Sequence, residues 1–282
     1  MLPDKDWHGI EFERTAIDCK LPNAFILRSG FYFYFLESGR LEVAAGGSCS
    51  TAGPGQLVFC PAWARRRLKP LTAICRLITV RMRYNAFAVE VQADAEALDI
   101  LMALARRCER RGHVLSPSPG ASAQIGKILQ ETLAEGMPNQ PGVNLFKKAA
   151  ALGLLGVLSR ERWLSGLFPA GSSVTSAYRN IQNALLYIEE HYSEAIGIEE
   201  MARAACLSRS HFQAVFRQYT GLPPKTYLTR YRLGAACRLL ATTEESIAMV
   251  AYTAGFGSMS QFYSAFTKTM RTTPAEFKKG RI

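Results

Sequence analysis

The 282-residue chain is 48% hydrophobic and 20% charged, which is an ordinary globular composition and excludes a collagen-like or disordered chain. A chain of this length is expected to fold as about two domains, each with its own core. The net charge of +11 and the isoelectric point of about 9.5 favour an acidic partner such as nucleic acid. The charge does not locate that partner, because residues 180–282 hold 12 Lys and Arg against 8 Asp and Glu, and residues 1–170 hold 21 against 15.

The seven cysteines are scattered and include no Cys-x-x-Cys pair. This argues against a disulfide framework or a zinc finger and for a reducing cytoplasm. The amino terminus lacks the apolar segment of a signal peptide, and no run of 18 apolar residues is present, so we expect no membrane span. The four histidines form no metal-ligand set, so no metal, cofactor or catalytic residue is expected.

Between Glu11 and Arg83, short runs of β-branched and aromatic residues alternate with Gly and Pro turns, a pattern that predicts strands. The predicted strands are Ala24–Leu27, Phe31–Leu36, Arg40–Ala44, Gln56–Phe59 and Ala73–Arg83. The Phe31–Leu36 run, FYFYFL, is apolar on both faces and suits a strand buried inside a small antiparallel roll or barrel. The basic run Arg65–Arg67 with Lys69 is most simply a solvated loop, with contact to DNA, an anionic effector or a protein partner as alternatives.

From Asp94 onward the apolar period becomes helical. One helix is expected from Asp94 to near Gly112, followed by a loop, and a second helix ends at Gly136. A third helix, Leu145–Leu164, is apolar on most sides and suits either a domain core or a helix–helix contact surface. A fourth is expected from about Ala177 to Tyr192.

These patterns divide the chain into a β-roll with helices over residues 1–165, a linker over residues 166–176, and an all-α domain over residues 177–282. The fold class is therefore expected to be α+β.

The all-α domain contains one pattern twice, which indicates a duplicated supersecondary unit. The small and apolar residues Ile198, Met201, Ala202, Ala205 and Leu207 have equivalents 49 positions later, and Phe212, Phe216, Pro224 and Tyr227 have equivalents 50 positions later. Each copy predicts a short helix, a turn and a second helix that begins after Ser208 or Ser258. This is a helix-turn-helix, whose second helix can enter the major groove of DNA.

The outward positions of the two second helices carry side chains suited to bases and phosphates. The candidate DNA-binding residues are Arg209, Ser210, Gln213, Ala214 and Arg217 in the first copy, and Ser258, Met259, Ser260, Gln261, Ser264 and Lys268 in the second. Polar residues on a helix can simply face water, and it is their repetition on two copies that favours DNA binding.

With these residues identified, the region from about residue 180 to residue 280 resembles the DNA-binding domain of AraC/XylS-family transcription regulators. The segment RLGAACRLL (Arg232–Leu240) is similar to the family's connecting-helix pattern, and Ile247–Phe277 is similar to its signature. The resemblance implies helix-turn-helix units over about residues 198–220 and 247–270, joined by a helix over about residues 225–241. A connecting helix of roughly 15 residues spans about 22 Å, which is less than the groove repeat of about 34–36 Å, so bent DNA is implied.

Some residues depart from the family pattern. Cys206 stands where the first turn usually has Gly, and Arg271 stands where the second recognition helix usually ends in Gly. A left-handed Arg271 would cost roughly 1 kcal/mol. Many relatives carry Arg at the positions of Ala214 and Ser264, so base contacts in the first copy are expected to depend on Gln213 and its neighbours.

The N-terminal region resembles the family's cupin-like sensor or dimerisation domain through GPGQLVFCP, Gly53–Pro61. The aromatic residues 31–35 could line a small-molecule cavity, but a filled core is the simpler interpretation because no polar anchor is evident.

The resemblance implies a non-enzymatic cytoplasmic regulator, more an activator than a repressor, that binds promoter double-stranded DNA and contacts RNA polymerase. A homodimer formed through the N-terminal or middle helices, with Leu145–Leu164 as the candidate, and a protein or small-molecule effector are also implied. The short sensor region and the low His content resemble the virulence or secretion-system regulators of the family more than its sugar sensors. The alternative function is a small-molecule-binding or enzymatic β-domain with a helical C-terminal half.

Overall fold

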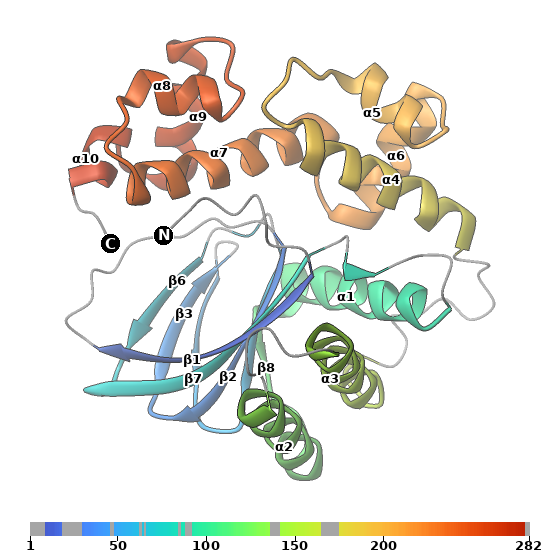
Figure 1. The fold of residues 1–282 in the computed structure, drawn as a ribbon, viewed down its shortest axis with the longest axis vertical. Coiled ribbons are helices and arrows are strands. Elements are labelled where there is room, and N and C mark those ends of the chain that lie inside the picture. Colours follow the sequence, from blue (N-terminus) through green and yellow to red (C-terminus); the bar gives the residue numbers. More distant parts are fainter. Residues whose placement is uncertain are drawn as a thin grey trace.

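A computed structural model describes residues 9–18, 30–45, 48–61, 64, 66–83, 86–87, 92–135, 142–164 and 175–279 of the chain. Strands and three helices form the N-terminal part, and helices alone form the C-terminal part, which lies above the sheets in Figure 1. The predicted α+β class is therefore confirmed. The predicted strand Ala24–Leu27 and most of the predicted linker lie outside the described residues.

Two antiparallel sheets face each other and form a β-roll. The strands are β1 (Ile10–Asp18), β2 (Phe31–Ser38), β3 (Leu41–Ala45), β4 (Ser48–Ala52), β5 (Leu57–Cys60), β6 (Arg66–Pro70), β7 (Ile74–Met82) and β8 (Val114–Leu115). The larger sheet has the order β1-β7-β2-β5-β8, and the smaller one has the order β4-β3-β6.

Strand β2 is buried on both faces, as its FYFYFL sequence predicts. Because successive side chains of a strand point to opposite faces, Phe31, Phe33 and Phe35 share one face. That face packs in the same core as the apolar residues of the helices. Tyr32 and Tyr34 point the other way and join the apolar residues of β3 in the interior of the roll.

Four strands lie in segments where the sequence analysis named none, and the first of them is β1 at the edge of the larger sheet. Arg66 and Arg67 belong to β6, which pairs with β3, so the prediction of a solvated loop is wrong there. The serine-rich segment Ser48–Ala52 forms the edge strand β4. Within the loop predicted after Gly112, Val114–Leu115 pairs with β5 as β8.

The helices that cover the larger sheet are α1 (Gln92–Arg111), α2 (Pro119–Glu135) and α3 (Val143–Ser159). Helix α3 ends five residues before the predicted Leu164. Its apolar residues Ala151, Leu154 and Leu158 are buried in the core, whereas Leu145 in its first turn is 76% exposed. The prediction that this helix packs in the domain core is therefore confirmed for its C-terminal part.

The C-terminal helices are α4 (Thr175–His191), α5 (Ile198–Ala204), α6 (Arg209–Thr220), α7 (Pro224–Thr242), α8 (Ile247–Thr253), α9 (Met259–Met270) and α10 (Pro274–Lys279). We call α5 with α6 the first unit, and α8 with α9 the second unit. Helix α7 runs between the two units (Figure 1). None of the helices in the described parts of the chain has the length and apolar character needed to cross a bilayer.

The two units belong to different hydrophobic cores. The core of the first unit, including Phe212 and Phe216, is continuous with α4, α1 and the larger sheet. The core of the second unit, including Phe262 and Phe266, is separate. It contains residues of the C-terminal half of α7, and Phe277 of α10 and Tyr192 pack against it. The first unit therefore shares one hydrophobic core with the β-roll, whereas the hydrophobic core of the second unit is separate from that of the roll.

Candidate nucleic-acid interface

The turns of the two units have the same backbone hydrogen bonds. In the first unit, the Leu207 N–H donates to the Ala202 carbonyl at 3.0 Å, and in the second the Phe256 N–H donates to the Ala251 carbonyl at 3.0 Å. These pairs are offset by 49 residues, as the repeat predicts. The duplication is therefore one of backbone geometry as well as of sequence.

Each turn contains a residue in the left-handed region. In the second unit it is Gly255, with φ of 86°, and in the first it is Cys206, with φ of 52°. The second helices also end in this conformation, at Gly221 with φ of 75° in the first unit and at Arg271 with φ of 58° in the second. The two departures from the family pattern thus occupy positions that favour glycine.

The start of the second helix is capped differently in the two units. Ser258 accepts a hydrogen bond from the Gln261 N–H at 3.2 Å through its hydroxyl oxygen. Ser208 occupies the expected N-cap position of α6, but its side chain makes no capping hydrogen bond. Because a side-chain cap stabilises the first turn of a helix, the N-terminus of α9 is more stable than that of α6 in this respect.

Matching aromatic pairs lie beneath the two second helices. The ring centroids of Phe212 and Phe216 are 5.2 Å apart, and those of Phe262 and Phe266 are 5.4 Å apart. Phe216 also meets Tyr227 at 5.4 Å, and Phe266 meets its equivalent, Phe277, at 5.6 Å. All four phenylalanines of the two pairs are fully buried, so the opposite faces of α6 and α9 are held outward.

The structure exposes almost all of the candidate DNA-binding residues. The exposed ones are Arg209, Ser210, Gln213, Ala214 and Arg217 on the first unit, and Ser258, Ser260, Gln261, Ser264 and Lys268 on the second. Met259 differs, because it is half-buried and packs against the core of the second unit.

Further exposed residues on the same helices were not among the candidates. Tyr263 on α9 is 38% exposed and occupies the position equivalent to Gln213. His211 and Gln218 on α6 and Thr267 on α9 are also exposed. The repeat offset of 50 residues was the signal that could have added Tyr263, because it pairs that residue with Gln213. An aromatic ring at this position can contact a thymine methyl group.

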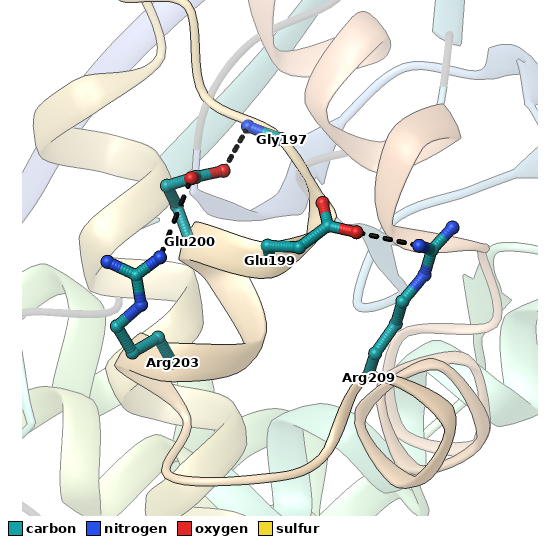
Figure 2. Close-up of polar contacts among 5 residues, drawn as sticks. All are labelled: Gly197, Glu199, Glu200, Arg203 and Arg209. Carbon is teal, nitrogen blue, oxygen red and sulfur yellow. Dashed lines mark hydrogen bonds and ion pairs between the residues drawn. The ribbon is translucent and has the colours of Figure 1, made fainter.

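An ion pair joins the two helices of the first unit (Figure 2). Nη1 of Arg209 on α6 lies 2.7 Å from Oε1 of Glu199 on α5, and both side chains are more than half exposed. Glu199 therefore occupies one edge of a guanidinium that could otherwise bind a phosphate. Because exposed ion pairs are weak, a DNA phosphate can compete with it.

The neighbouring Glu200 fixes the start of α5 (Figure 2). It accepts a hydrogen bond from the Gly197 N–H at 2.9 Å and lies 3.7 Å from Nη2 of Arg203. The backbone N–H groups of Glu200 itself and of Gly197 lower its pKa, so the carboxylate stays charged at the N-terminus of the helix.

The segment that directly follows α4 positions the second unit. Arg232 on α7 donates to the carbonyls of Tyr192 and Glu194, each at 2.7 Å. Gly255 lies so close to this segment that an added Cβ would be 2.4 Å from the Tyr192 carbonyl oxygen. The second unit therefore also packs against the segment after α4, and glycine at position 255 allows this close approach because it has no Cβ.

Two equivalent helix-turn-helix units on one connecting helix define a double helix-turn-helix DNA-binding module. The helix-turn-helix domain family matches residues 201–280. The chain is 34% identical over 101 residues to the HTH-type transcriptional activator RhaS of Enterobacter sp. (strain 638), a match that covers 36% of each chain. It is 28% identical over 153 residues to RhaS of Salmonella paratyphi B, covering 54% of this chain and 52% of the relative. The chain thus matches about a third to about half of the length of these curated relatives.

The whole fold is similar to that of ToxT from Vibrio cholerae, with a TM-score of 0.59 at 13% identity, over 97% of this chain and 99% of that chain. The C-terminal helices within residues 201–280 form a helix-turn-helix domain of the AraC type.

Proposed function

We propose that this protein is a sequence-specific DNA-binding transcription regulator that reads two successive major grooves through α6 and α9. The observation that carries the proposal is the presence of two exposed polar helix faces on one duplicated backbone frame. The named activator function of the RhaS relatives supports activation as the sign of regulation. Such a regulator would act in the cytoplasm, without catalysis.

The two faces would read different half-sites. The first presents Arg209, Gln213 and Arg217, whereas the second presents mainly hydroxyl groups, with Lys268 as its one basic candidate. Arginine suits guanine and phosphate, and glutamine suits adenine. We therefore expect an asymmetric site, with the greater part of the salt dependence arising from the first unit.

Helix α7 affects how the DNA must be shaped. It has 19 residues, longer than the roughly 15 expected, and spans about 28 Å. This length remains below the groove repeat of about 34–36 Å. A bend in the DNA, at a cost of a few kcal/mol, is therefore part of the proposal.

Other parts of the proposal rest on the family resemblance: contact with RNA polymerase, a homodimer, an effector and a virulence or secretion-system role. For the dimer, the exposed Leu145 and Phe146 at the start of α3 are consistent with a contact surface.

Selection of fragments from the source genome by the purified full chain, with competitor DNA and at several salt concentrations, tests the function. We expect an asymmetric preferred site, with relaxed preference at one position for Gln213→Ala and an unchanged site for the control Gln130→Ala on α2. Binding without sequence preference at every salt concentration would refute the proposal. An unchanged preference in Gln213→Ala would remove only that residue from base readout.

A further inference from the structure

Residues 192–197 join α4 to α5, and we call them the α4–α5 segment. The segment leads directly into the first unit at Ile198, and in Figure 1 it lies between the two units. Its Tyr192 side chain packs against the cores of both units. The ring centroids of Tyr192 and Tyr231 on α7 are 5.2 Å apart. A segment that belongs to the first unit by chain connection thus also contacts the second.

Arg232 joins this segment to α7 with two hydrogen bonds from one guanidinium. Its Nε donates to the Tyr192 carbonyl and its Nη2 donates to the Glu194 carbonyl, each at 2.7 Å. The segment is itself fixed in a turn, because the Glu194 N–H donates to the His191 carbonyl at 2.9 Å. A planar guanidinium that donates from two nitrogens fixes a direction as well as a distance.

Gly255, in the turn between α8 and α9, brings the second unit to the same place. A Cβ built on Gly255 would overlap the Tyr192 carbonyl oxygen, and it would lie 2.8 Å from Cα of Ser193 and 3.0 Å from Nε of Arg232. The Tyr192 carbonyl therefore meets both α7 and the turn of the second unit. Because glycine has no side chain, the two backbones approach each other directly.

Helix α7 alone does not determine how the second unit is oriented. The boundary between the two hydrophobic cores falls within α7, since Leu228 belongs to the first core and Leu233 to the second. Gly234 lies beside this boundary, and glycine weakens a helix interior. Arg232 lies at the boundary and reaches the α4–α5 segment. It therefore adds a contact away from the axis of α7, and such a contact opposes bending and rotation of the second unit.

The orientation of α9 relative to α6 matters because DNA is a helix. Each base pair added between two half-sites moves the second half-site by about 3.4 Å and turns it by about 35° around the DNA axis. A second unit held at two points cannot follow this rotation. A second unit attached through α7 alone could follow part of it.

We propose that Arg232 is a positioning residue that fixes α9 relative to α6 and so makes the protein specific for one spacing of its two half-sites. Arg232 acts through the Tyr192 and Glu194 carbonyls and not through contact with DNA. The spacing is then recognised in addition to the bases that α6 and α9 contact. This inference rests on the proposed function, because it specifies how far apart the two DNA segments must lie.

The test measures Kd of the purified full chain for its preferred site and for sites with one base pair inserted or removed between the half-sites. Fluorescence anisotropy at one salt concentration gives each value. We expect the unmodified chain to lose at least about tenfold in affinity for either change. A further DNA with a scrambled second half-site shows whether the second unit binds in each protein.

Arg232→Met should reduce the loss for a one-base-pair change to about threefold or less, while an intact second half-site is still preferred to a scrambled one. Arg232→Lys keeps the positive charge without the planar fork, so its loss should be intermediate. Lower stability alone would weaken binding at every spacing by the same factor. Lys225→Met, which removes a positive charge from an exposed side chain of α7, is the control and should keep the full loss. If Arg232→Met does not fold or ignores the second half-site, Arg232→Lys decides the question.

A measurement without DNA separates this inference from the proposed function. Spin-labelled unnatural amino acids at Ser210 on α6 and Ser260 on α9, which are exposed and equivalent in the repeat, report the distance between the two helices by pulsed electron paramagnetic resonance. The distance distribution should be narrow in the unmodified chain and in Lys225→Met, and broader in Arg232→Met. If no preferred DNA site exists, the proposed function fails, and the distribution still tests whether Arg232 fixes α9.

Three results would overturn the proposal. One is a loss of less than about twofold when the spacing is changed for the unmodified chain. Another is an equal loss in the unmodified chain and in the Arg232 variants that bind both half-sites. The third is a distance distribution of the same width in the unmodified chain and in folded Arg232→Met.

Discussion

Nη1 of Arg83 lies 3.2 Å from Oε1 of Glu189, and both side chains are only 10% exposed. Arg83 directly follows β7, and Glu189 is on α4, so this buried ion pair joins the β-roll to the C-terminal helices. Gln182, also on α4, donates its side-chain N–H to the Phe87 carbonyl at 2.8 Å. These contacts border the continuous core described above and hold the first unit in one orientation relative to the roll.

The ion pair can be tested by a double-mutant cycle with Arg83→Met and Glu189→Met. Each single change removes the direct ion-pair partner of a buried charged side chain, so each should lower the free energy of unfolding by about 3 kcal/mol. The double variant should lose much less than the sum of the two. Urea denaturation measures all four proteins, and strictly additive losses would contradict a direct coupling between the two residues.

A pH dependence is expected from Asp99 on α1, beside Tyr219 on α6. Burial raises the pKa of Asp99 to about 6, with Arg106 lowering it and Glu96 raising it. Because the folded pKa lies above the unfolded value, the favourable contribution of this group is full below about pH 4 and is lost as the pH rises through about 6. The charged form of Asp99 therefore destabilises the contact between α1 and α6 at neutral pH.

Asp99→Asn removes this penalty. After allowance for solvent screening, the variant should be more stable than the unmodified chain by about 1 kcal/mol above pH 7, with no difference below about pH 4. Thermal unfolding from pH 4 to pH 8 measures the effect. Glu131→Gln, which removes one negative charge from the exposed surface of α2, is the control. A difference that is constant with pH would exclude titration of Asp99 as its cause.

The two left-handed non-glycine residues allow a matched backbone test. Cys206→Gly and Arg271→Gly should each raise the stability by about 0.5–1 kcal/mol, because glycine removes the strain at positive φ. Gly255→Ala should do the reverse and at greater cost, because the new Cβ would also meet the Tyr192 carbonyl. Melting temperatures check all three changes, and destabilisation by both glycine variants would show that the native side chains contribute more than the strain costs.

The helices of the C-terminal domain could be predicted in detail because its sequence contains two copies of one unit. Comparison of the two copies identifies the core residues, since these are the positions where the residue type recurs. Residues such as Phe212 and Phe262 must fill equivalent spaces, so their types persist while the outward positions diverge. The helical period of the apolar residues can be recognised within each segment alone, so each helix could be predicted without knowledge of its neighbours.

The strands and contacts that were missed lack such a local signal. Arg66 lies within a run of basic residues, a pattern that usually marks solvent, and its burial depends on Tyr32 and Tyr34 more than 30 residues away. The β4 sequence, SCSTA, has no apolar alternation, because edge strands with one face in water need little of it. Arg83 and Glu189 are separated by about 100 residues, and only the packing of α4 on the roll brings them together.

The separate cores of the two units predict different consequences of one substitution. Phe266→Ala should destabilise the second unit by roughly 3–5 kcal/mol through the cavity it leaves. Phe216→Ala should instead destabilise the continuous core of the first unit and the roll. Hydrogen exchange distinguishes them, since Phe266→Ala should speed exchange in α8 and α9 and leave α6 protected. Equal loss of protection in both units would mean that the two cores unfold together.

The exposed ion pair between Glu199 and Arg209 predicts a gain of DNA affinity on substitution. Glu199→Gln releases the Arg209 guanidinium and removes a negative charge close to the approaching phosphates. We expect Kd for the preferred site to fall about two- to fivefold at low salt, with the difference shrinking as salt rises. Arg209→Ala should weaken binding and reduce the slope of affinity against salt concentration by about one ion. Fluorescence anisotropy with Glu131→Gln as the charge-matched control measures these changes. If Glu199→Gln binds more weakly than the control, Glu199 holds Arg209 in the orientation that DNA requires, and competition between Glu199 and phosphate is wrong.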